Sequence, residues 1–319
     1  MIESVRPVTL ADIEAARARI AGTVLRTPLV RLDLGGDGPD IRLKLENLQP
    51  TNAYKIRGAA NAVANLSEED RSRGVWTVSA GNAGQGVAFA ARAAGVPCTV
   101  VAIETAPQTK LDRMAALGAR IVPVSYDDAW QAVTDHAFAG MDGTFIHPFD
   151  NHDFVAGHAT MGFEILEDAP DVGTVIAPIG GGGLISGVGS GIKVKRPDVK
   201  VIGAEPDTAA PFALSLREGR PRRFTDWQAS FVDGAGGKSI TERMWERMIP
   251  VTDGTITVTL DQTRDAMRLI AEKSRTIAEG AGALSVAAAV TGEAGEGPIV
   301  CVISGGNIDL SKFAELVAS

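Results

Sequence analysis

Lys55 is the side chain in this sequence with the most distinctive chemical setting. It lies in the tract PTNAYKIRGAA, between Tyr54 and Ile56. Apolar surroundings disfavour the ammonium form of a lysine, and a neutral amine can form a Schiff base with a carbonyl group. Because most lysines are simply solvated, this tract alone leaves both interpretations open.

Four consecutive glycines, at residues 180–183, follow the apolar run TVIAPI and precede the stretch GLISGVGSG. Glycine lets backbone N–H groups approach an anion closely, and the start of a helix adds a favourable dipole. The segment therefore predicts a phosphate-binding loop, with a flexible turn as the alternative. A dinucleotide-binding fingerprint is excluded, because Ile185 and Ser186 stand where G-x-G-x-x-G requires glycine.

The tract SAGNAGQ, at residues 79–85, lies between a predicted strand and a predicted helix. Its small residues leave backbone N–H groups accessible to an anion such as a carboxylate. A simple turn is the alternative interpretation.

Two further patterns resemble binding motifs but lack the required spacing. GGKS at residues 236–239 resembles the end of a nucleotide-binding loop, but Val232 occupies the position of the earlier glycine, so we predict an ordinary loop. Three histidines lie near two aspartates, a composition that could supply a metal. Their spacing matches no familiar ligand pattern, so we predict loop and helix-start roles and no metal site. These residues are His147, His152, His158, Asp150 and Asp153.

Short β-branched runs alternate with helical stretches, which is typical of parallel strands joined by crossover helices. We predict an α/β fold of parallel or mixed sheets flanked by helices. Predicted strands cover residues 41–46, 75–79, 98–103, 119–124, 174–179, 199–205, 255–260 and 298–304. Predicted helices cover residues 11–20, with a capping box at Thr9 and Asp12, and 54–66, 84–95, 108–118, 155–168, 183–191, 261–274 and 280–292. The last of these helices is Ala/Gly-rich and is expected to pack in the core.

Composition excludes several classes of protein. The 319 residues carry 31 basic and 39 acidic side chains, a net charge of −8, which argues against a nucleic-acid or anionic-membrane surface. There is no uninterrupted apolar run of about 18 residues and no signal-peptide pattern at the N-terminus, so we predict no membrane contact. Cys98 and Cys301 lie in apolar runs, which indicates buried, reduced thiols and a cytoplasmic protein.

Taken together and in order, these tracts resemble the fold type II pyridoxal-phosphate enzymes, specifically the threonine/serine dehydratase and serine racemase group. The resemblance covers nearly the whole chain and includes HPFD with VAGHAT, VDG, AEGAGA and SGGNID. It implies a two-lobed fold like that of tryptophan synthase β, with pyridoxal 5'-phosphate in the cleft between the lobes. Residues 71–147 would form a small lobe that closes over the substrate, and residues 1–70 with 148–319 the large cofactor-binding lobe.

The resemblance also implies roles for individual residues. Lys55 would hold the cofactor and then remove the Cα proton. The other cofactor contacts would be Tyr54 on the ring, Asn82 at the ring hydroxyl, Gly180, Gly181, Gly182, Gly183 and Leu184 at the phosphate, Gly234, Glu279, and Ser304 at the pyridine nitrogen. The substrate would be held by Ser79, Ala80, Gly81, Asn82 and Ala83, mainly through its carboxylate.

Ser304 bears on the type of reaction. A neutral hydroxyl does not stabilise a protonated pyridinium as a carboxylate would, so a long-lived carbanion is disfavoured and prompt loss of a β-hydroxyl is favoured. The implied reaction is α,β-elimination from L-threonine or L-serine, which gives 2-oxobutanoate or pyruvate and ammonia.

Several positions depart from the usual pattern of the group. Asn52 and Ala53 stand where Gly and Ser are commoner, Ala83 replaces the usual His, and His158 replaces the usual Gln. A small residue at position 83 leaves room for a bulkier or more polar β-substituent. The substrates 3-hydroxyaspartate and phenylserine therefore stay as alternatives.

Three other functions fit the sequence less well than elimination. A serine racemase needs a second proton carrier, and Ala80, which stands where the family has Ser, cannot move a proton. A β-replacement enzyme fits the KIRGA and GGGGL tracts less well. A non-catalytic amino-acid-binding module is disfavoured because Lys55, Asn82 and Ser304 are all retained.

The remaining expectations concern metals, regulation and assembly. Some members bind a divalent cation after an EP dipeptide, but Pro211 follows Glu205 at the relevant spacing, so we predict no metal. Because the chain ends at Ser319, we expect no C-terminal regulatory domain. We expect a homodimer that acts on a small amino acid and binds neither nucleic acid nor membrane.

Overall fold

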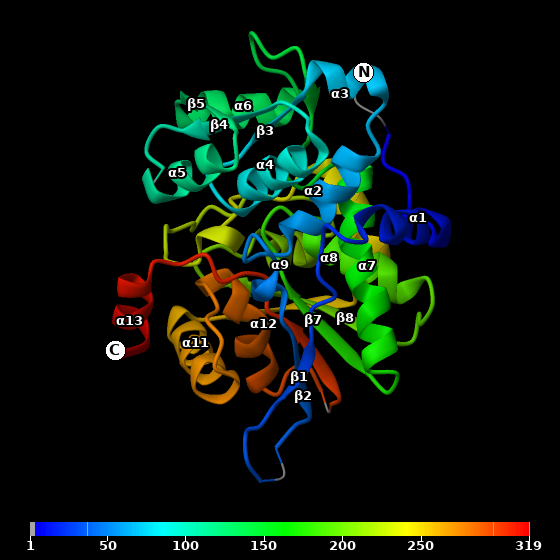
Figure 1. Ribbon diagram of the computed structural model, residues 1–319. Helices are drawn as coiled ribbons and strands as arrows, with labels where there is room; N and C mark the ends of the chain where they lie inside the picture. Colours follow the sequence, from blue (N-terminus) through cyan, green and yellow to red (C-terminus); the bar gives the residue numbers. More distant parts are fainter. Residues whose placement is uncertain (1–3, 37, 107, 296, 319) are drawn as a thin grey trace.

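Two β-sheets organise the part of the chain that the computed structural model describes, residues 4–36, 38–106, 108–295 and 297–318 (Figure 1). The six-stranded sheet is parallel except for its first pair of strands. Its strands, in spatial order, are β1 (Leu29–Leu32), β2 (Ile41–Lys44), β10 (Ile299–Val302), β7 (Thr174–Pro178), β8 (Lys200–Pro206) and β9 (Gly254–Val258). The four-stranded sheet is parallel and contains β5 (Arg120–Val124), β4 (Cys98–Ile103), β3 (Val75–Val78) and β6 (Thr144–Phe145).

Helices cover both sheets, as expected for parallel strands joined by crossovers. The α-helices are α1 (Leu10–Ile20), α2 (Lys55–Ala64), α3 (Glu68–Arg73), α4 (Asn82–Ala94), α5 (Gln108–Ala116), α6 (Tyr126–Asp135), α7 (His152–Asp168), α8 (Gly183–Lys193), α9 (Pro211–Glu218), α10 (Glu242–Met248), α11 (Leu260–Ser274), α12 (Gly280–Val290) and α13 (Leu310–Ala318). Short 3-10 helices are η1 (Glu46–Leu48), η2 (Asp233–Ala235) and η3 (Ile249–Val251).

The larger sheet is buried on both faces. Along β10, Ile299 and Cys301 join a core cluster with α11 and α12, while Val300 and Val302 join a second cluster with α7 and α8. Side chains alternate between the faces of a strand, so both sets are apolar when both faces are covered. Figure 1 shows α11 and α12 on one side of this sheet and α7 on the other.

The glycine-rich sequence of α8 allows an unusually close helix contact. A Cβ added to Gly191 would lie 2.2 Å from the carbonyl oxygen of Ala159 on α7, and one added to Gly187 would lie 2.8 Å from that of Val155. Larger residues would force the two helices apart. This packing accounts for part of the glycine excess of the chain, 36 residues in 319.

A cluster of buried charges lies on the side of α2 that faces η1 and α7. Arg57 donates to both carboxylate oxygens of Glu46 and of Glu164, each at 2.8 Å. Lys44 donates to Glu164 at 2.6 Å and to the carbonyl of Thr27 at 2.7 Å. We call Lys44, Glu46, Arg57 and Glu164 the buried charge cluster. It joins β2, η1, α2 and α7.

The predicted fold class is confirmed, and most predicted elements occur within a few residues of their expected bounds. The capping box at Thr9 and Asp12 and the buried α12 are confirmed as well. The sequence analysis did not predict β1, β6, α3, α6, α9, α10 or α13. Several of these elements are short, and β1 and β6 lie at sheet edges, where the apolar pattern is weakest.

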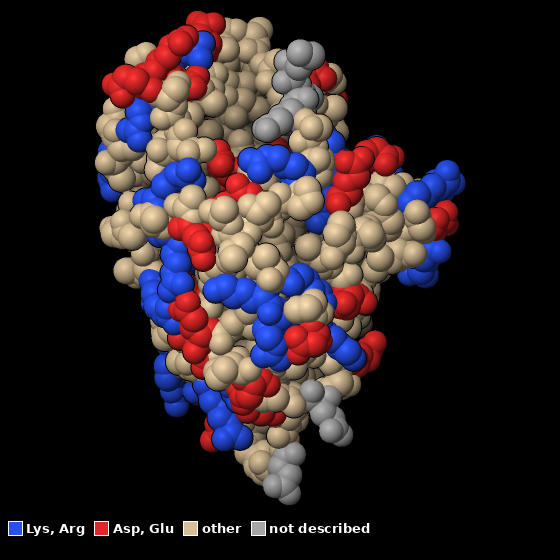
Figure 2. Space-filling view, turned by 90° about the vertical axis from the view of Figure 1, so that its right-hand side faces the viewer, with Lys and Arg blue, Asp and Glu red and all other residues tan. Residues whose placement is uncertain are grey.

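Charges of both signs are interspersed on the face of the molecule that carries α1 and α7 (Figure 2). Arg17 on α1 donates to Glu167 at 2.9 Å, and Arg42 donates to Asp171 at 2.7 Å. Positive and negative groups on this face therefore largely offset each other. No helix in the described part of the chain is both long and apolar enough to cross a membrane.

Candidate active site

A cavity of about 420 Å³ lies where the carboxyl ends of strands from both sheets meet. Parallel α/β sheets bind ligands at this end of their strands, where loops and helix N-termini converge. Eleven residues predicted for the site line this cavity: Tyr54, Lys55, Ser79, Ala80, Gly81, Asn82, Ala83, Gly181, Gly234, Glu279 and Ser304. Gly180, Gly182, Gly183 and Leu184 do not line it, although they flank Gly181 in the same loop.

Lys55 begins α2 and reaches the cavity wall. Its Nζ donates to the carbonyl oxygen of Pro148 at 2.6 Å and lies 5.3 Å from the ring centroid of Tyr54. Within the described residues, no carboxylate forms an ion pair with this amine. Burial without a counter-charge lowers the pKa of Lys55 to about 7, so much of the amine is neutral near physiological pH.

Tyr54 connects Lys55 to the end of β10. Its backbone N–H donates to the carbonyl of Ser304 at 2.9 Å, and Ala53 forms a bridge with Gly305. These bonds place Ser304, distant in sequence, beside the lysine. Ser304 is 4% exposed, and its hydroxyl donates to no other described residue.

His158 packs behind Tyr54, at a position that departs from the usual pattern. Its ring lies edge-on to Tyr54 at 4.7 Å and to Phe154 at 4.8 Å, and neither ring nitrogen has a hydrogen-bond partner among the described residues. Burial holds the pKa of His158 well below its usual value. This histidine is therefore a neutral packing group.

The four-glycine loop joins β7 to α8 and has the geometry of an anion cradle. Gly182 has φ +89°, a left-handed conformation that glycine adopts readily, and it precedes the first residue of the helix. A Cβ on Gly181 would lie 2.5 Å from the Phe149 ring. No side chain caps the first N–H groups of α8, so they are available to an anion.

A chain of hydrogen bonds fixes the orientation of Asn82. The Asn82 amide donates to Glu279 Oε1 at 2.7 Å, and its oxygen accepts from Asn307 at 2.8 Å. Arg113, on α5, donates to Asn307 at 3.1 Å. Burial, together with the nearby Asp233, raises the pKa of Glu279 to about 7.

Sequence reasoning missed several residues at this site. Asn307 is the last residue of the SGGN tract and was not singled out. Lys110 on α5 and Asp233 in η2 line the cavity and form an ion pair of 2.7 Å, and Phe149 also lines the wall. No local motif marks Lys110, and Asp233 lies in the VDG tract but was given no role; the two residues are 123 positions apart.

The turn at residues 79–85 is shorter than predicted. Helix α4 begins at Asn82, two residues before the expected start, so Asn82 and Ala83 belong to its first turn. The backbone of Ser79, Ala80 and Gly81 forms the turn itself. Both parts face the cavity.

The histidines that could have supplied a metal have other contacts. His147 Nδ1 accepts from the backbone N–H groups of Phe149 and Asp150, and His152 Nε2 lies 3.4 Å from Asp12. Among the described residues, no group of three or more His, Cys, Asp or Glu side chains could hold a metal ion. The GGKS tract is a loop, as predicted.

This combination of fold and site defines a class of protein: a two-sheet α/β enzyme with an anion-binding glycine loop and a half-buried lysine that has no carboxylate partner among the described residues. Those two features fit an aldehyde cofactor with a phosphate group. The family model of pyridoxal-phosphate dependent enzymes matches residues 20–305. The chain therefore belongs to this family, and its cofactor is pyridoxal phosphate.

Individual relatives are similar over nearly the whole length of this chain. The L-threonine ammonia-lyase of Thermotoga maritima is 39% identical over 97% of this chain and 78% of that protein. The catabolic L-threonine dehydratase of Staphylococcus aureus is 34% identical over 99% of this chain and 94% of that protein. The structure of maize serine racemase superposes with a TM-score of 0.89 at 30% identity, over 96% of each chain.

Proposed function

We propose that this protein catalyses α,β-elimination from a β-hydroxy amino acid, with L-threonine and L-serine as its main substrates. The products are 2-oxobutanoate or pyruvate, and ammonia. The observation that carries this proposal is the Lys55 amine, which faces the cavity, has no acidic partner in the described part of the chain, and has a pKa of about 7. The similarity to an L-threonine ammonia-lyase and to an L-threonine dehydratase supports threonine as a substrate.

The proposed contacts with the cofactor follow from the donors around the cavity. Lys55 would hold it covalently, the Gly180–Gly183 loop and Leu184 its phosphate, and Asn82 its ring hydroxyl. Ser304 would face its ring nitrogen, with Tyr54, Gly234 and Glu279 around the ring. Bound pyridoxal phosphate withdraws electrons from the substrate Cα and so makes its proton easier to remove.

The chain's own groups then carry out the proton transfer and the positioning. The neutral amine of Lys55 accepts the proton from Cα, and the ammonium so formed gives a proton to the β-hydroxyl, which leaves as water. The released enamine then reacts with water to give the 2-oxo acid and ammonia. The turn at residues 79–83, which leads into α4, binds the substrate carboxylate through the N–H groups of Ala80, Asn82 and Ala83. The N–H groups of Ser79 and Gly81 donate to the Val101 carbonyl and to Ser79 Oγ. The neutral hydroxyl of Ser304 would leave the pyridine nitrogen of the cofactor uncharged, which favours early loss of the β-substituent.

Racemisation is disfavoured by the same cavity. It requires a second proton carrier opposite Lys55, and the side chain of Ala80 is a methyl group. Lys110 lines the wall and could pair with a β-carboxylate, which keeps 3-hydroxyaspartate in the substrate panel.

We also propose that residues 71–147 form a lobe that closes on the remainder of the chain and excludes water from the reaction. All four strands of the smaller sheet lie between Val75 and Phe145, which supports this division. The Lys110–Asp233 ion pair and the Arg113–Asn307 hydrogen bond join α5 to residues outside that lobe. They would form a latch in the closed state.

The proposed setting is a cytoplasmic homodimer. Cys98 and Cys301 are free and buried, which supports a reducing compartment. Sedimentation equilibrium of the holoenzyme tests the dimer: a mass of one chain contradicts it.

A 2-oxo-acid release assay on cofactor-loaded protein tests the function. The panel is L-threonine, L-serine, D-serine, threo-3-hydroxyaspartate and phenylserine. We expect the fastest turnover with L-threonine or L-serine. Turnover only of 3-hydroxyaspartate or phenylserine would mean that the altered pocket around Ala83 selects the larger substrates. No turnover of any substrate, with an intact cofactor band, would overturn the proposal of elimination.

A further inference from the structure

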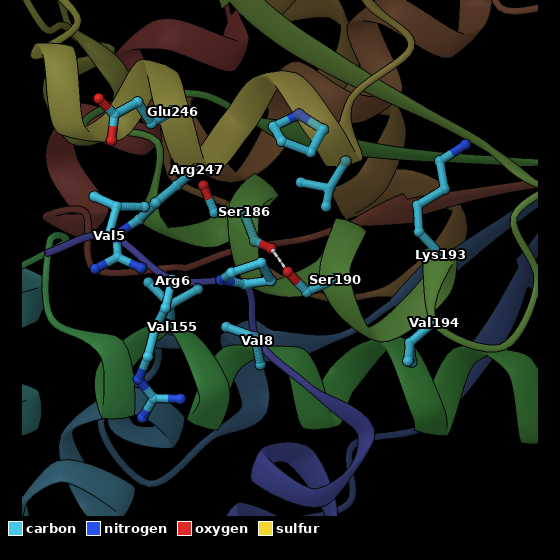
Figure 3. A pocket seen from close by; sticks show the side chains of 13 residues that line it. Val5, Arg6, Val8, Val155, Ser186, Ser190, Lys193, Val194, Glu246 and Arg247 are labelled. Carbon is cyan, nitrogen blue, oxygen red and sulfur yellow. Dashed lines mark hydrogen bonds between the residues drawn. The ribbon is translucent and has the colours of Figure 1, made fainter.

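A second cavity lies between the N-terminal segment and helices α7, α8 and α10 (Figure 3). Its volume is about 420 Å³, and it shares no lining residue with the candidate active site. Val5, Val8, Val155, Val194 and Val251 give it an apolar wall. A cavity of this size is large enough for a small organic molecule.

Ser186 presents an unpaired hydroxyl to this cavity. The residue is 1% exposed, and its Oγ has no hydrogen-bond partner among the described residues. One turn later Ser190 behaves as helical serines usually do, donating to the Ser186 carbonyl at 2.7 Å, the dashed line in Figure 3. A buried hydroxyl without a partner is costly, and a bound ligand would satisfy it.

Arg247 lies next to Ser186, and only part of its guanidinium group is hydrogen-bonded. Its side chain is 5% exposed, and its Nε donates to Asp150 Oδ1 at 2.9 Å. Within the described residues, its two terminal nitrogens donate no hydrogen bond. Guanidinium N–H groups bind carboxylates through such a pair of donors.

The other charged groups restrict what this cavity accepts. Lys193 is occupied by Asp253 at 2.7 Å and by the Val199 carbonyl at 2.9 Å. Arg6, which also lines the cavity, is paired with Asp12 at 3.3 Å. Glu246, at the rim, repels further negative charge. Among the described residues that line the cavity, the terminal nitrogens of Arg247 therefore remain as cationic donors, which suits an anion with a single charge better than a phosphate or a dicarboxylate.

We propose that this cavity is a binding site for a small aliphatic monocarboxylate, separate from the active site. Its carboxylate bonds to the terminal nitrogens of Arg247 and to the hydroxyl of Ser186. Its short hydrocarbon chain packs against the valine wall.

The site is connected to Lys55 through residues 147–150. Arg247 holds Asp150, whose backbone N–H donates to His147 Nδ1 at 2.9 Å. Between them, Phe149 lines the candidate active site, and the Pro148 carbonyl accepts from Lys55. A ligand that engages Arg247 therefore acts on the segment that holds the lysine.

Calorimetric titration of the holoenzyme tests this site, with sodium 3-methylbutanoate as the probe and 3-methylbutanamide as its neutral counterpart. We expect the carboxylate to bind once per chain and the amide not to bind. Ser186→Ala is expected to weaken binding roughly tenfold, because it removes one hydrogen bond to a charged group. Ser190→Ala is the matched control and is expected to leave binding within about twofold, because that hydroxyl is committed to the backbone.

Ser186→Ala should not lower the unfolding midpoint, since the hydroxyl that it removes has no partner. Ser186→Cys, nearly the same size, is the second variant and should weaken binding in the same direction. Binding of 3-methylbutanoate that neither variant changes would overturn the proposal, as would a holoenzyme that binds neither 3-methylbutanoate nor butanoate. The titration does not depend on which reaction the protein catalyses.

Discussion

Helix α2 carries two cations whose surroundings differ completely, Lys55, which is half-buried at the cavity wall, and Arg57, which is fully buried. Lys55 has only a carbonyl oxygen and aromatic rings around its amine, whereas Arg57 contacts two carboxylates in the buried charge cluster. Burial lowers the pKa of Lys55 to about 7. Burial acts on Arg57 in the same direction, but the charges of Glu46 and Glu164 outweigh it and hold the pKa of Arg57 above its usual value.

The comparison shows that burial alone does not decide what a cation does. A buried cation with carboxylate partners stays charged and holds elements together. A buried amine without them loses part of its charge and becomes a nucleophile and a base. In this protein the two outcomes occur within three residues of one helix, so they can be compared directly.

The largest expected effect is the loss of turnover in Lys55→Ala. Removal of both the cofactor attachment and the base should lower kcat by about 10³-fold or more. The unfolding midpoint should not fall, since this amine has no ionic partner to leave behind. Measurement of 2-oxo-acid release and of thermal unfolding checks both points.

Lys44→Met is the matched variant at the other buried lysine. Lys44 is 0% exposed and is paired with Glu164, so its loss should reduce stability while turnover per folded molecule is kept. If Lys55→Ala instead destabilised the protein while Lys44→Met abolished turnover, the assignment of catalysis to Lys55 and of stability to the buried charge cluster would be wrong.

Arg57→Ala should cost about 3–5 kcal/mol in the free energy of unfolding, because it removes the ion-pair partner of the buried Glu46 and leaves Glu164 with Lys44. Urea unfolding of the wild type and the variant measures the difference. Arg73→Ala, which removes an exposed arginine, serves as the control and should change little. A loss below about 1 kcal/mol for Arg57→Ala would mean that the cluster is not a major source of stability.

Cofactor loading should depend on pH through Lys55. Because burial lowers the pKa of Lys55 to about 7, the protonated amine predominates below pH 7 and the reactive neutral amine above it. The loading rate of apoprotein should therefore rise roughly tenfold per pH unit below about pH 7 and then level off. Visible absorbance after mixing, from pH 6 to 9, gives this rate. A rate that still rose tenfold between pH 8 and 9 would indicate an ordinary solvated lysine.

Asn307→Ala should have the smallest effect, a severalfold loss of kcat/KM together with a shift in the visible absorbance of the holoenzyme. Asn307 acts through Asn82, whose orientation it fixes. Asn307→Asp should be no better, since a carboxylate cannot donate to the Asn82 oxygen. Arg113→Met, which removes only the outer link, should change the spectrum less. An unchanged spectrum in Asn307→Ala would leave this residue without a positioning role.

Much of the fold was predictable because its signals are local. The alternation of β-branched runs with helical stretches predicted eight of the strands, and the capping residues Thr9 and Asp12 located the first helix. Edge elements such as β1 and β6 were missed. Their positions depend on a neighbouring strand, so the pattern within each segment is too weak to identify them.

The sequence by itself determined which chemical groups this protein has: the lysine in its apolar tract, the glycine loop and the serine at the end of the last strand. Tertiary structure decided what surrounds them. Contacts between residues far apart in the chain bring Asn307 and Lys110 to the site. Such contacts also give Lys44 and Arg57 their carboxylate partners, whereas Lys55 has none among the residues that the structure describes. The pKa of a buried group is set by charges within a few ångströms, and only the fold specifies which charges those are.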